Sequence, residues 1–266
     1  MNILDKIILE KKSIVEVSKK EVSIAALEKS SYFQHRTYSF EEQLKLANGT
    51  GIIAEFKRQS PSKGAINKNA DVEKVSKAYE EAGAVAISVL TDETFFGAEK
   101  NDFALARKMV NIPLLRKDFI IDEYQIIETK AMGADLLLLI GACLSKQQIK
   151  SFANLANSIG LQVLLEIHTV EELDMITEHC NFIGINNRNL KTFEVDLENS
   201  IRLANSLPKE KIKIAESGIS EVDTVLHLQK QGFEGFLMGE NFMKTDDPGK
   251  SCREFIQQLK NQEYEY

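Results

Sequence analysis

Short apolar runs alternate with amphipathic stretches about eight times from Gly51 onward, and this alternation limits the possible folds of the 266-residue chain most strongly. Short apolar runs are typical of buried strands, and apolar residues three and four apart are typical of helices. The expected strands are Ile52–Phe56, Ala84–Leu90, Pro113–Arg116, Leu136–Ile140, Gln162–Glu166, Phe182–Ile185, Lys213–Ala215 and Gly235–Met238. Continuously apolar strands joined by helices are expected to be parallel. Eight such units predict an α/β fold, a closed (β/α)8 TIM barrel.

The stretches between the strands have helical periodicity. The expected helices are Asp71–Ala82, Asp122–Met132, Lys146–Ile159, Val170–Glu178, Glu221–Gln231 and Pro248–Leu259. Glycines 83, 133 and 232 follow three of these helices, where a left-handed residue commonly ends a helix. A doubly wound open sheet is the alternative fold. That fold should have a GxGxxG turn after its first strand, and this chain has none there.

A helical region precedes the first strand. Ile8, Leu9, Ile14 and Val15 form an apolar stripe, and a second helix is expected to begin at Phe40. We therefore expect one domain over residues 1–266, with a helical extension over 1–48 and the barrel over 49–266.

Composition and charge exclude several classes of protein. The net charge of -7 argues against nucleic acid as a partner, because a phosphate backbone requires a basic face. The N-terminus lacks the apolar segment of a signal peptide, and no apolar run is long enough to span a membrane. The three cysteines, at positions 143, 180 and 252, are scattered, so they indicate reduced thiols in a cytoplasmic protein.

Charged residues follow several of the apolar strands. In a barrel of this kind the active site lies at the carboxyl ends of the strands. The charged residues expected there are Glu55, Lys57, Lys117, Glu166, Arg188, Glu216 and Glu240. Crowded charges are costly to desolvate, so their convergence favours chemistry over stability.

Two glycine-containing loops indicate the type of substrate. Ser217-Gly218 and Gly239-Glu240 follow the last two strands, where backbone N–H groups at helix N-termini bind phosphate in this barrel class. The predicted substrate is therefore a phosphorylated small molecule.

Other polar residues have simpler interpretations. His168 is interpreted as a capping or surface residue, and His35, His179 and His227 as structural or exposed. Cys143 is expected to be a small packed residue. Phe95 and Phe96 fit either the barrel rim or a ligand pocket.

Taken together, six motifs resemble those of the indole-3-glycerol-phosphate synthase family. They are Ile53-Ala-Glu-Phe-Lys-Arg-Gln-Ser-Pro-Ser, Leu90-Thr-Asp-Glu-Thr-Phe-Phe, Leu115-Arg-Lys-Asp-Phe, Leu165-Glu, Gly184-Ile-Asn-Asn-Arg-Asn-Leu and Ala215-Glu-Ser-Gly-Ile. The resemblance extends from about Ile3 to the last helix, and implies a helical extension over the barrel mouth. One departure is the loop Gly97-Ala98-Glu99, where the family commonly has a small residue and Ser after the glycine.

The resemblance implies a reaction and roles for individual residues. The family closes 1-(2-carboxyphenylamino)-1-deoxy-D-ribulose 5-phosphate to indole-3-glycerol phosphate in tryptophan biosynthesis, with loss of carbon dioxide and water. The implied catalytic residues are Lys117 as general acid, Glu166 and Lys57 as the acid–base pair for water loss, Glu55 as a proton acceptor that holds Lys57, and Asn186 and Ser217 as positioning groups. The implied substrate contacts are Ser60, Pro61, Phe96, Phe119, Arg188, Glu216, Gly218, Leu237, Gly239 and Glu240. No metal, cofactor, nucleic acid, membrane or obligate protein partner is expected.

A lysine that acts as a general acid near neutral pH is expected to have a lowered pKa, either because Lys57 lies nearby or because the lysine is partly buried. The alternatives are phosphoribosylanthranilate isomerase, which would use a Cys and an Asp at the strand ends, and a non-enzymatic barrel that binds a phosphorylated metabolite.

Overall fold

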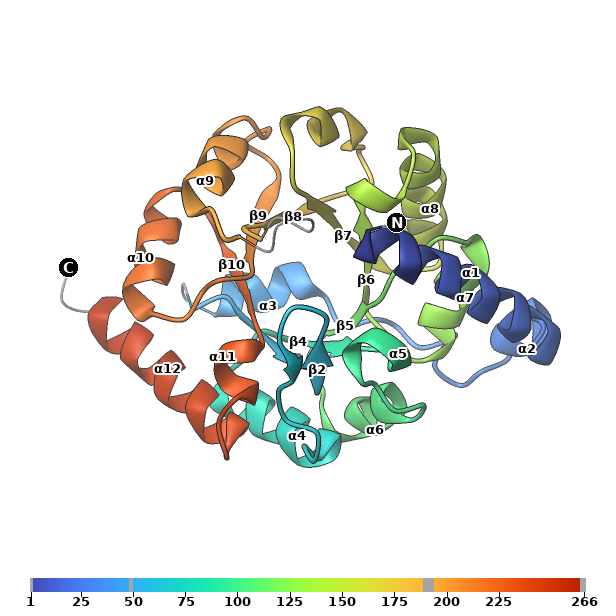
Figure 1. Cartoon of the computed structure of the whole chain (residues 1–266), viewed down its shortest axis with the longest axis horizontal. Helices are drawn as coiled ribbons and strands as arrows, with labels where there is room; N and C mark the ends of the chain where they lie inside the picture. The colour runs from blue at the N-terminus through green and yellow to red at the C-terminus, as the bar shows by residue number, and fades with distance from the viewer. Residues whose placement is uncertain (1, 48–49, 189–193, 264–266) are drawn as a thin grey trace.

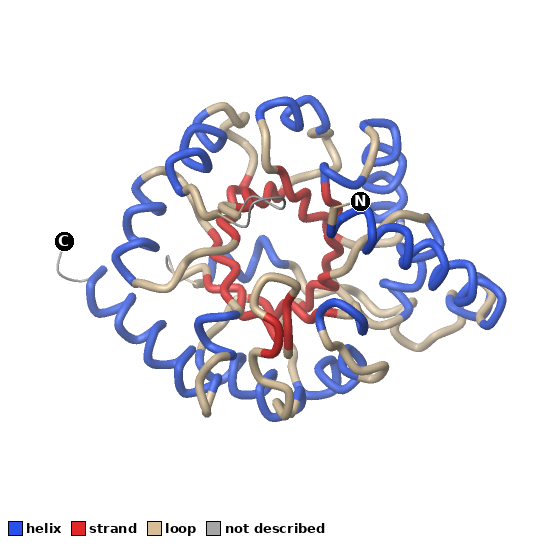
Figure 2. Tube along the Cα trace, viewed as in Figure 1, coloured by secondary structure: helices blue, strands red, loops and turns tan. Residues whose placement is uncertain are grey.

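Eight parallel strands form a closed ring at the centre of the molecule (Figures 1 and 2). The computed structural model describes residues 2–47, 50–188 and 194–263. Around the ring the order is β1-β10-β9-β8-β7-β6-β5-β4. The strands are β1 Ile52–Phe56, β4 Ala86–Leu90, β5 Leu114–Lys117, β6 Leu136–Ile140, β7 Gln162–Ile167, β8 Phe182–Asn186, β9 Ile212–Glu216 and β10 Gly235–Met238. The predicted TIM barrel is therefore confirmed, and every expected strand is present.

Helices surround the ring and cover its outer face (Figure 2). The α-helices are α1 Ile3–Glu21, α2 Ile24–Leu27, α3 Phe40–Leu46, α4 Val72–Ala82, α5 Glu93–Phe96, α6 Asp102–Met109, α7 Glu123–Ala131, α8 Lys146–Ser158, α9 Leu197–Asn205, α10 Val222–Lys230, α11 Glu240–Met243 and α12 Pro248–Glu263. Two short 3-10 helices are η1 Gly141–Cys143 and η2 Val170–Met175, and a hairpin pairs β2 Gln59–Ser60 with β3 Gly64–Ala65. Glycines 83, 133 and 232 have positive φ, as predicted for the ends of their helices.

The α-helix predicted over Val170–Glu178 is wrong, because this segment forms the 3-10 helix η2 and then becomes extended at Ile176. Thr169 makes no side-chain cap, and the Glu172 carboxylate instead accepts a hydrogen bond from the backbone N–H of His168. The segment is therefore held against the end of β7 rather than continuing as a helix.

Side chains on the inner face of the strands form a separate core inside the barrel. Ile53, Leu115, Leu164 and Ile214 belong to this buried cluster, together with Phe40 of α3. Because side chains alternate along a strand, the next inward position on each of these four strands lies two residues later, at the carboxyl end. Those four positions are occupied by Glu55, Lys117, Glu166 and Glu216. The barrel interior thus changes from apolar to charged in one layer.

The N-terminal extension reaches both ends of the barrel. Helix α3 lies behind the ring in Figure 1, where Phe40 is fully buried and its ring centroid lies 4.9 Å from that of Phe182. The backbone N–H of Phe40 donates a hydrogen bond to the side-chain oxygen Oε1 of Gln162, at the start of β7. Helix α1 lies at the opposite end, at the front in Figure 1; its N-terminal end meets the edge of the ring, and the rest of the helix runs outward over α7. The expected cover over the mouth is therefore α1, and α3 closes the other end. The expected boundary at residues 48 and 49 lies outside the described residues.

The predicted apolar stripe of α1 is wrong in part. The buried residues are Ile7, Lys11 and Val15, whereas Leu9 is 59% exposed and Ile14 is 41% exposed. Lys11 forms ion pairs with two carboxylates of the barrel, and these contacts set the rotation of the helix. Within the described residues, no helix is long and apolar enough to cross a membrane.

Candidate active site

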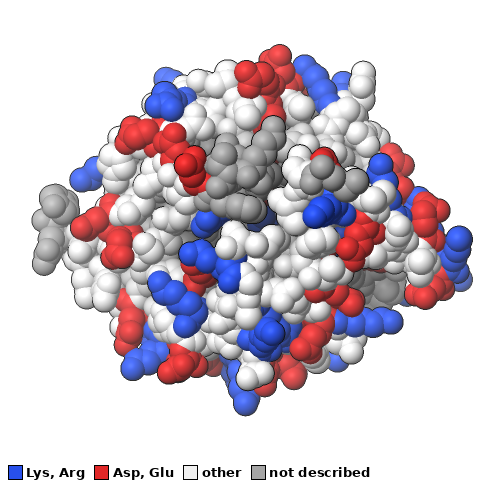
Figure 3. Space-filling model, viewed as in Figure 1, with Lys and Arg blue, Asp and Glu red and all other residues white. Residues whose placement is uncertain are grey.

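All sixteen predicted site residues line one cavity at the carboxyl ends of the strands. Ile3, Leu4 and Ile7 of α1 also line it, so the extension forms part of its wall. Figure 3 views this face and shows basic side chains beside the central opening, with both signs of charge farther out. The structure therefore brings together residues that are far apart in the sequence.

Lys117 lies among carboxylates at the centre of this cavity. Its Nζ is 3.1 Å from Oε2 of Glu166 and 3.6 Å from Oε2 of Glu216. Asn186 donates from Nδ2 to Oε1 of Glu166 at 2.9 Å. On the other side of the ring, Nζ of Lys57 lies 2.5 Å from Oε1 of Glu55. The site therefore contains two lysine–glutamate pairs, on β5 with β7 and at the end of β1.

The expected lowering of the Lys117 pKa is wrong. Burial opposes the charge of the ammonium, but the neighbouring carboxyl groups, with Glu166 the largest contributor, outweigh burial and raise the pKa of Lys117. Burial also opposes ionisation of Glu166, yet Lys117 and His168 hold the pKa of that carboxyl well below its usual range. Lys117 is therefore an ammonium and Glu166 a carboxylate at neutral pH, because each is buried beside its opposite charge.

Glu216 is held in the opposite protonation state. Burial, followed by repulsion from Glu166, raises the pKa of Glu216 to about 8. The side chain lies against Gly184, where an added Cβ would come within 2.1 Å of Oε1 of Glu216. A protonated carboxyl at this position can donate a hydrogen bond to a substrate hydroxyl.

The His168 side chain is mostly covered, so its interpretation as a capping or surface residue is wrong. Only 10% of its side chain is exposed, and Nε2 lies 3.1 Å from Oε1 of Glu166. His168 does not line the cavity, but it contacts the Glu166 carboxylate. His168 lies two residues after Glu166, so both side chains are on one strand face. This spacing was the indication in the sequence that His168 lies beside Glu166.

Aromatic side chains form one wall of the cavity. Phe96 of α5 and Phe119 after β5 pack with their ring centroids 6.1 Å apart, and Pro61 lies in the turn between β2 and β3. The alternative that Phe96 packs only on the rim is therefore wrong, since it lines the cavity. Cys143 packs against the core as expected, and burial raises the pKa of its thiol to about 12.

The two glycine-containing loops differ in geometry. Ser217 and Gly218 both have positive φ, and Nδ2 of Asn187 donates to the carbonyl oxygen of Ser217 at 2.7 Å. Helix α10 begins at Val222, so the expectation that Ser217-Gly218 forms a helix N-terminus is wrong. Gly239 does precede a helix directly, the four-residue α11. The strained Ser217 is held by a hydrogen bond rather than by a helix.

A carboxylate also lies between basic groups at the edge of this region. Oε1 of Glu240 is 3.3 Å from Nζ of Lys63, and Oε2 is 4.0 Å from Nη2 of Arg188. Asn189 and Leu190 of the resembling motif lie outside the described residues.

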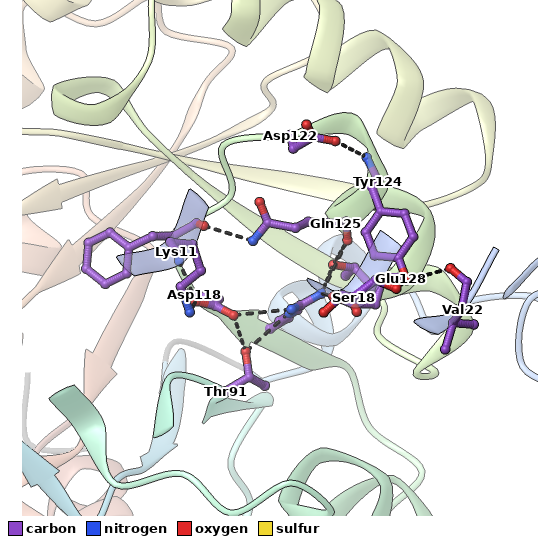
Figure 4. Close-up of polar contacts among 12 residues, drawn as sticks. Lys11, Ser18, Val22, Thr91, Asp118, Asp122, Tyr124, Gln125 and Glu128 are labelled. Atoms are coloured by element: carbon purple, nitrogen blue, oxygen red, sulfur yellow. Dashed lines mark hydrogen bonds and ion pairs between the residues drawn. The ribbon is translucent and has the colours of Figure 1, made fainter. Parts of the chain in front are cut away.

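Lys11 joins α1 to two loops of the site and was not predicted. Its Nζ lies 2.9 Å from Oδ2 of Asp92 and 2.8 Å from Oδ1 of Asp118. Asp118 stands between Lys117 and Phe119, and its other oxygen accepts a hydrogen bond from Thr91 (Figure 4). Nothing in the local pattern around Lys11 indicates burial, because the partners are distant in sequence. In the described part of the chain, no group of three or more His, Cys, Asp or Glu side chains is arranged to hold a metal ion.

Solved structures share the fold of this chain at low sequence identity. A 3-hexulose-6-phosphate synthase from Salmonella typhimurium aligns over 79% of this chain and 99% of its own, with a TM-score of 0.63 and 16% identity. A chain of tryptophan synthase from Pyrococcus furiosus aligns over 80% of this chain and 98% of its own, with a TM-score of 0.59 and 15% identity. These similarities support the barrel fold alone.

Sequence comparisons are more specific. The family model "Indole-3-glycerol phosphate synthase" matches residues 4–255. An indole-3-glycerol phosphate synthase from Bacteroides thetaiotaomicron is 46% identical over 258 residues, which cover 97% of this chain and 99% of the relative. Another from Alkaliphilus metalliredigens is 42% identical over 253 residues, covering 95% and 97%. This chain therefore belongs to the indole-3-glycerol phosphate synthase family.

Proposed function

We propose that Lys117, Glu166 and Lys57 perform the proton transfers of the reaction that this enzyme catalyses. The enzyme is a lyase of tryptophan biosynthesis, and it converts 1-(2-carboxyphenylamino)-1-deoxy-D-ribulose 5-phosphate to indole-3-glycerol phosphate, carbon dioxide and water. One observation carries the proposal: the inward positions that are apolar lower in the barrel become Glu55, Lys117, Glu166 and Glu216 at its mouth. Such a layer is costly unless its charges act on a substrate.

In the ring-closing step Lys117 is the general acid. The aromatic carbon that bears the carboxylate attacks the ribulose carbonyl carbon, and the carbonyl oxygen takes a proton from the Lys117 ammonium. The raised pKa of Lys117 keeps that proton available at neutral pH. Its ion pair with Glu166 holds the ammonium in place, which reduces the cost of orienting the donor. Carbon dioxide then leaves, and its bonding electrons restore the aromatic ring.

The final step removes water and needs an acid and a base on opposite sides of the substrate. Lys57 protonates the leaving hydroxyl, and Glu166 accepts the proton from the neighbouring carbon, which forms the new double bond. β1 and β7 are separated by three strands in each direction around the ring, so these two groups face each other across the mouth. Glu55 accepts a hydrogen bond from the Lys57 ammonium and so holds it in place.

The other cavity residues bind the substrate. Phe96, Phe119 and Pro61 enclose the aromatic ring, and Leu237 adds an apolar contact. Asn186, Glu216 and Ser217 position the hydroxyl groups. Ser60, Arg188 and the backbone N–H groups of Gly218 and Gly239 bind phosphate or carboxylate, and Glu240 holds Arg188 near them.

The test of this proposal is Lys117→Ala. We expect kcat to fall by about 10²–10⁴-fold, because one positioned proton donor is lost. Far-UV circular dichroism and substrate binding should stay close to those of the unchanged protein. Product formation can be followed by indole fluorescence, since the chain has no tryptophan. Lys250→Ala is the matched control, because Lys250 is exposed and its ion pair, with Glu254, lies on the outer helix α12. Unchanged turnover in Lys117→Ala would remove Lys117 as the acid.

We also infer that the extension (1–48) and the barrel (49–266) act as one domain of a cytoplasmic enzyme without an obligate protein partner. The cavity wall contains α1 residues and barrel residues of a single chain, which supports this inference. The cysteines are free thiols, as is usual in a reducing compartment. Cell fractionation tests the cytoplasmic location. Activity of the purified single chain tests whether the enzyme works without a protein partner.

A further inference from the structure

We propose that His168 is a positioning residue whose charge keeps Glu166 ionised, and that Glu172 in turn pairs with His168. The inference rests on the proposed role of Glu166 in proton transfer. It assigns a role to three neighbouring side chains, Glu172, His168 and Glu166, of which only Glu166 lines the cavity.

The course of the backbone brings the side chains of Glu166, His168 and Glu172 together. His168 follows β7 and lies two residues after Glu166, so both side chains are on the same face of the strand. Its Nε2 lies 3.1 Å from Oε1 of Glu166, and its Nδ1 lies 3.7 Å from Oε2 of Glu172. The same Glu172 oxygen accepts a hydrogen bond of 2.6 Å from the backbone N–H of His168. The 3-10 turn of η2 thus brings a buried carboxylate against the imidazole.

Each side of the Glu166 carboxylate has a different neighbour. Oε2 faces Lys117 at 3.1 Å, and Oε1 accepts from Asn186 at 2.9 Å while facing His168. Lys117 and Asn186 line the cavity, whereas His168 and Glu172 do not. His168 therefore acts on the substrate only through Glu166.

The surrounding charges keep the imidazole protonated. Glu166 on β7 and Glu172 on η2 face the ring, and Cys143 on η1 is a neutral thiol with a raised pKa. Lys117 and Glu216 lie beyond Glu166. Burial opposes the charge, but the contacts with the two carboxylates outweigh it and raise the pKa of His168 to about 10. An imidazolium behind Glu166 favours its carboxylate form, and loss of this cation should raise the Glu166 pKa.

The experiment compares His168→Gln with His168→Lys in the full-length enzyme. In His168→Gln we expect kcat to fall about ten-fold, as is common when an outer partner of a catalytic group is lost. The acidic limb of the kcat–pH profile should shift to higher pH by about one unit or more, while KM stays within about two-fold of its value in the unchanged enzyme. His168→Lys restores a cation and should return the limb toward its original position.

The matched control is His179→Gln, because Nε2 of His179 lies 3.8 Å from the exposed Glu178 and far from the cavity residues. This control should leave kcat and its pH profile unchanged. A folded His168→Gln protein with an unshifted acidic limb would overturn the proposal, as would failure of His168→Lys to restore it.

A measurement on the unchanged protein avoids any effect of substitution on folding. The ¹⁵N shifts of His168 should report an imidazolium up to at least about pH 8, and a neutral ring at pH 7 would overturn the proposal. The outcomes also separate this inference from the proposed function. If Lys117→Ala abolishes turnover and His168→Gln leaves the acidic limb of the kcat–pH profile unchanged, the proposed function stands and only the role of His168 is wrong.

Discussion

At the residue scale, Glu216 differs most from the usual behaviour of its side chain. The carboxyl is buried, and its Oε1 has no hydrogen-bond partner among the described residues. A buried carboxyl near a second carboxylate is less costly when it is protonated, which explains the direction of its pKa shift. Glu216 lines the cavity, and its unpartnered oxygen lies beside Gly184, where the absence of a side chain leaves room for the carboxyl group.

This protonation state predicts a pH-dependent effect of Glu216→Gln on stability. The pKa of Glu216 is raised from its ordinary value to about 8 in the folded protein, so the folded state binds more protons than the unfolded state between these values. The stabilisation from this group is complete at low pH and is lost as the pH rises through about 8. Relative to the unchanged protein, Glu216→Gln should therefore gain stability from pH 5 to pH 8, by at most about 1.4 kcal/mol per pH unit.

Urea unfolding at pH 5, 6, 7 and 8 measures this difference. A stability difference that stays constant over this range would show that Glu216 is ionised in the folded enzyme. The cation of His168 contributes equally to both proteins below pH 8, so it does not affect the comparison.

At the element scale, α1 is held to the barrel by one buried charge. Lys11 is 4% exposed and pairs with Asp92 and Asp118. Asp92 also accepts a hydrogen bond from Phe95 and so caps α5, which contains Phe96. Asp118 accepts from the backbone N–H of Phe119. The helix that covers the mouth is thus tied to both aromatic residues of the cavity wall.

We expect Lys11→Met to destabilise the protein by about 3–5 kcal/mol, because it leaves two buried carboxylates without their shared cation. KM should rise, since the loops that hold Phe96 and Phe119 lose a common anchor. Urea unfolding and steady-state kinetics measure the two effects. Lys19→Met is the matched control: Lys19 is on the same helix and pairs with Asp122 at 2.7 Å, but the pair is exposed and worth about 0–1 kcal/mol. Equal losses in both variants would contradict the anchoring role of Lys11.

At the scale of the whole molecule, the N-terminal extension contacts the barrel at two opposite ends. Lys11 binds loops at the carboxyl ends of β4 and β5, and Phe40 packs against Phe182 at the start of β8. The connection through α2 crosses the outside of the barrel near α7 (Figure 1). The barrel lies between these two contacts, so they share no side chain.

The separation predicts additive effects on stability. Phe40→Leu should cost about 1–3 kcal/mol through the cavity that it leaves, and its effect should add to that of Lys11→Met within about 0.5 kcal/mol. Only Lys11→Met should change KM. The double variant, compared with both single variants by urea unfolding, tests this. A coupling above about 1 kcal/mol would indicate that the two ends respond to each other through the barrel.

The positions of the strands could be predicted because each strand depends on local residues. The apolar run Leu136–Ile140 is a strand in any arrangement that covers both faces, and the result agrees residue for residue. The charged ends of these strands were also visible, since a lysine or glutamate two positions after an apolar residue shares its face. The 3-10 helix η2 was not predicted because the Glu172 side chain, within that segment, accepts a hydrogen bond from the backbone of His168 at the end of β7. Hydrophobic periodicity gives no indication of such a contact.

The sequence by itself determined the barrel, the end at which its charges gather and, through its motifs, the family. Tertiary structure alone decided which charges are buried together: Lys11 with Asp118, Lys117 with Glu166, and Glu216 beside Glu166. It also decided their protonation states, including the raised pKa of Lys117. The reason is physical: strand formation depends on neighbours along the chain, whereas desolvation and charge pairing depend on groups that meet only when the ring of strands closes.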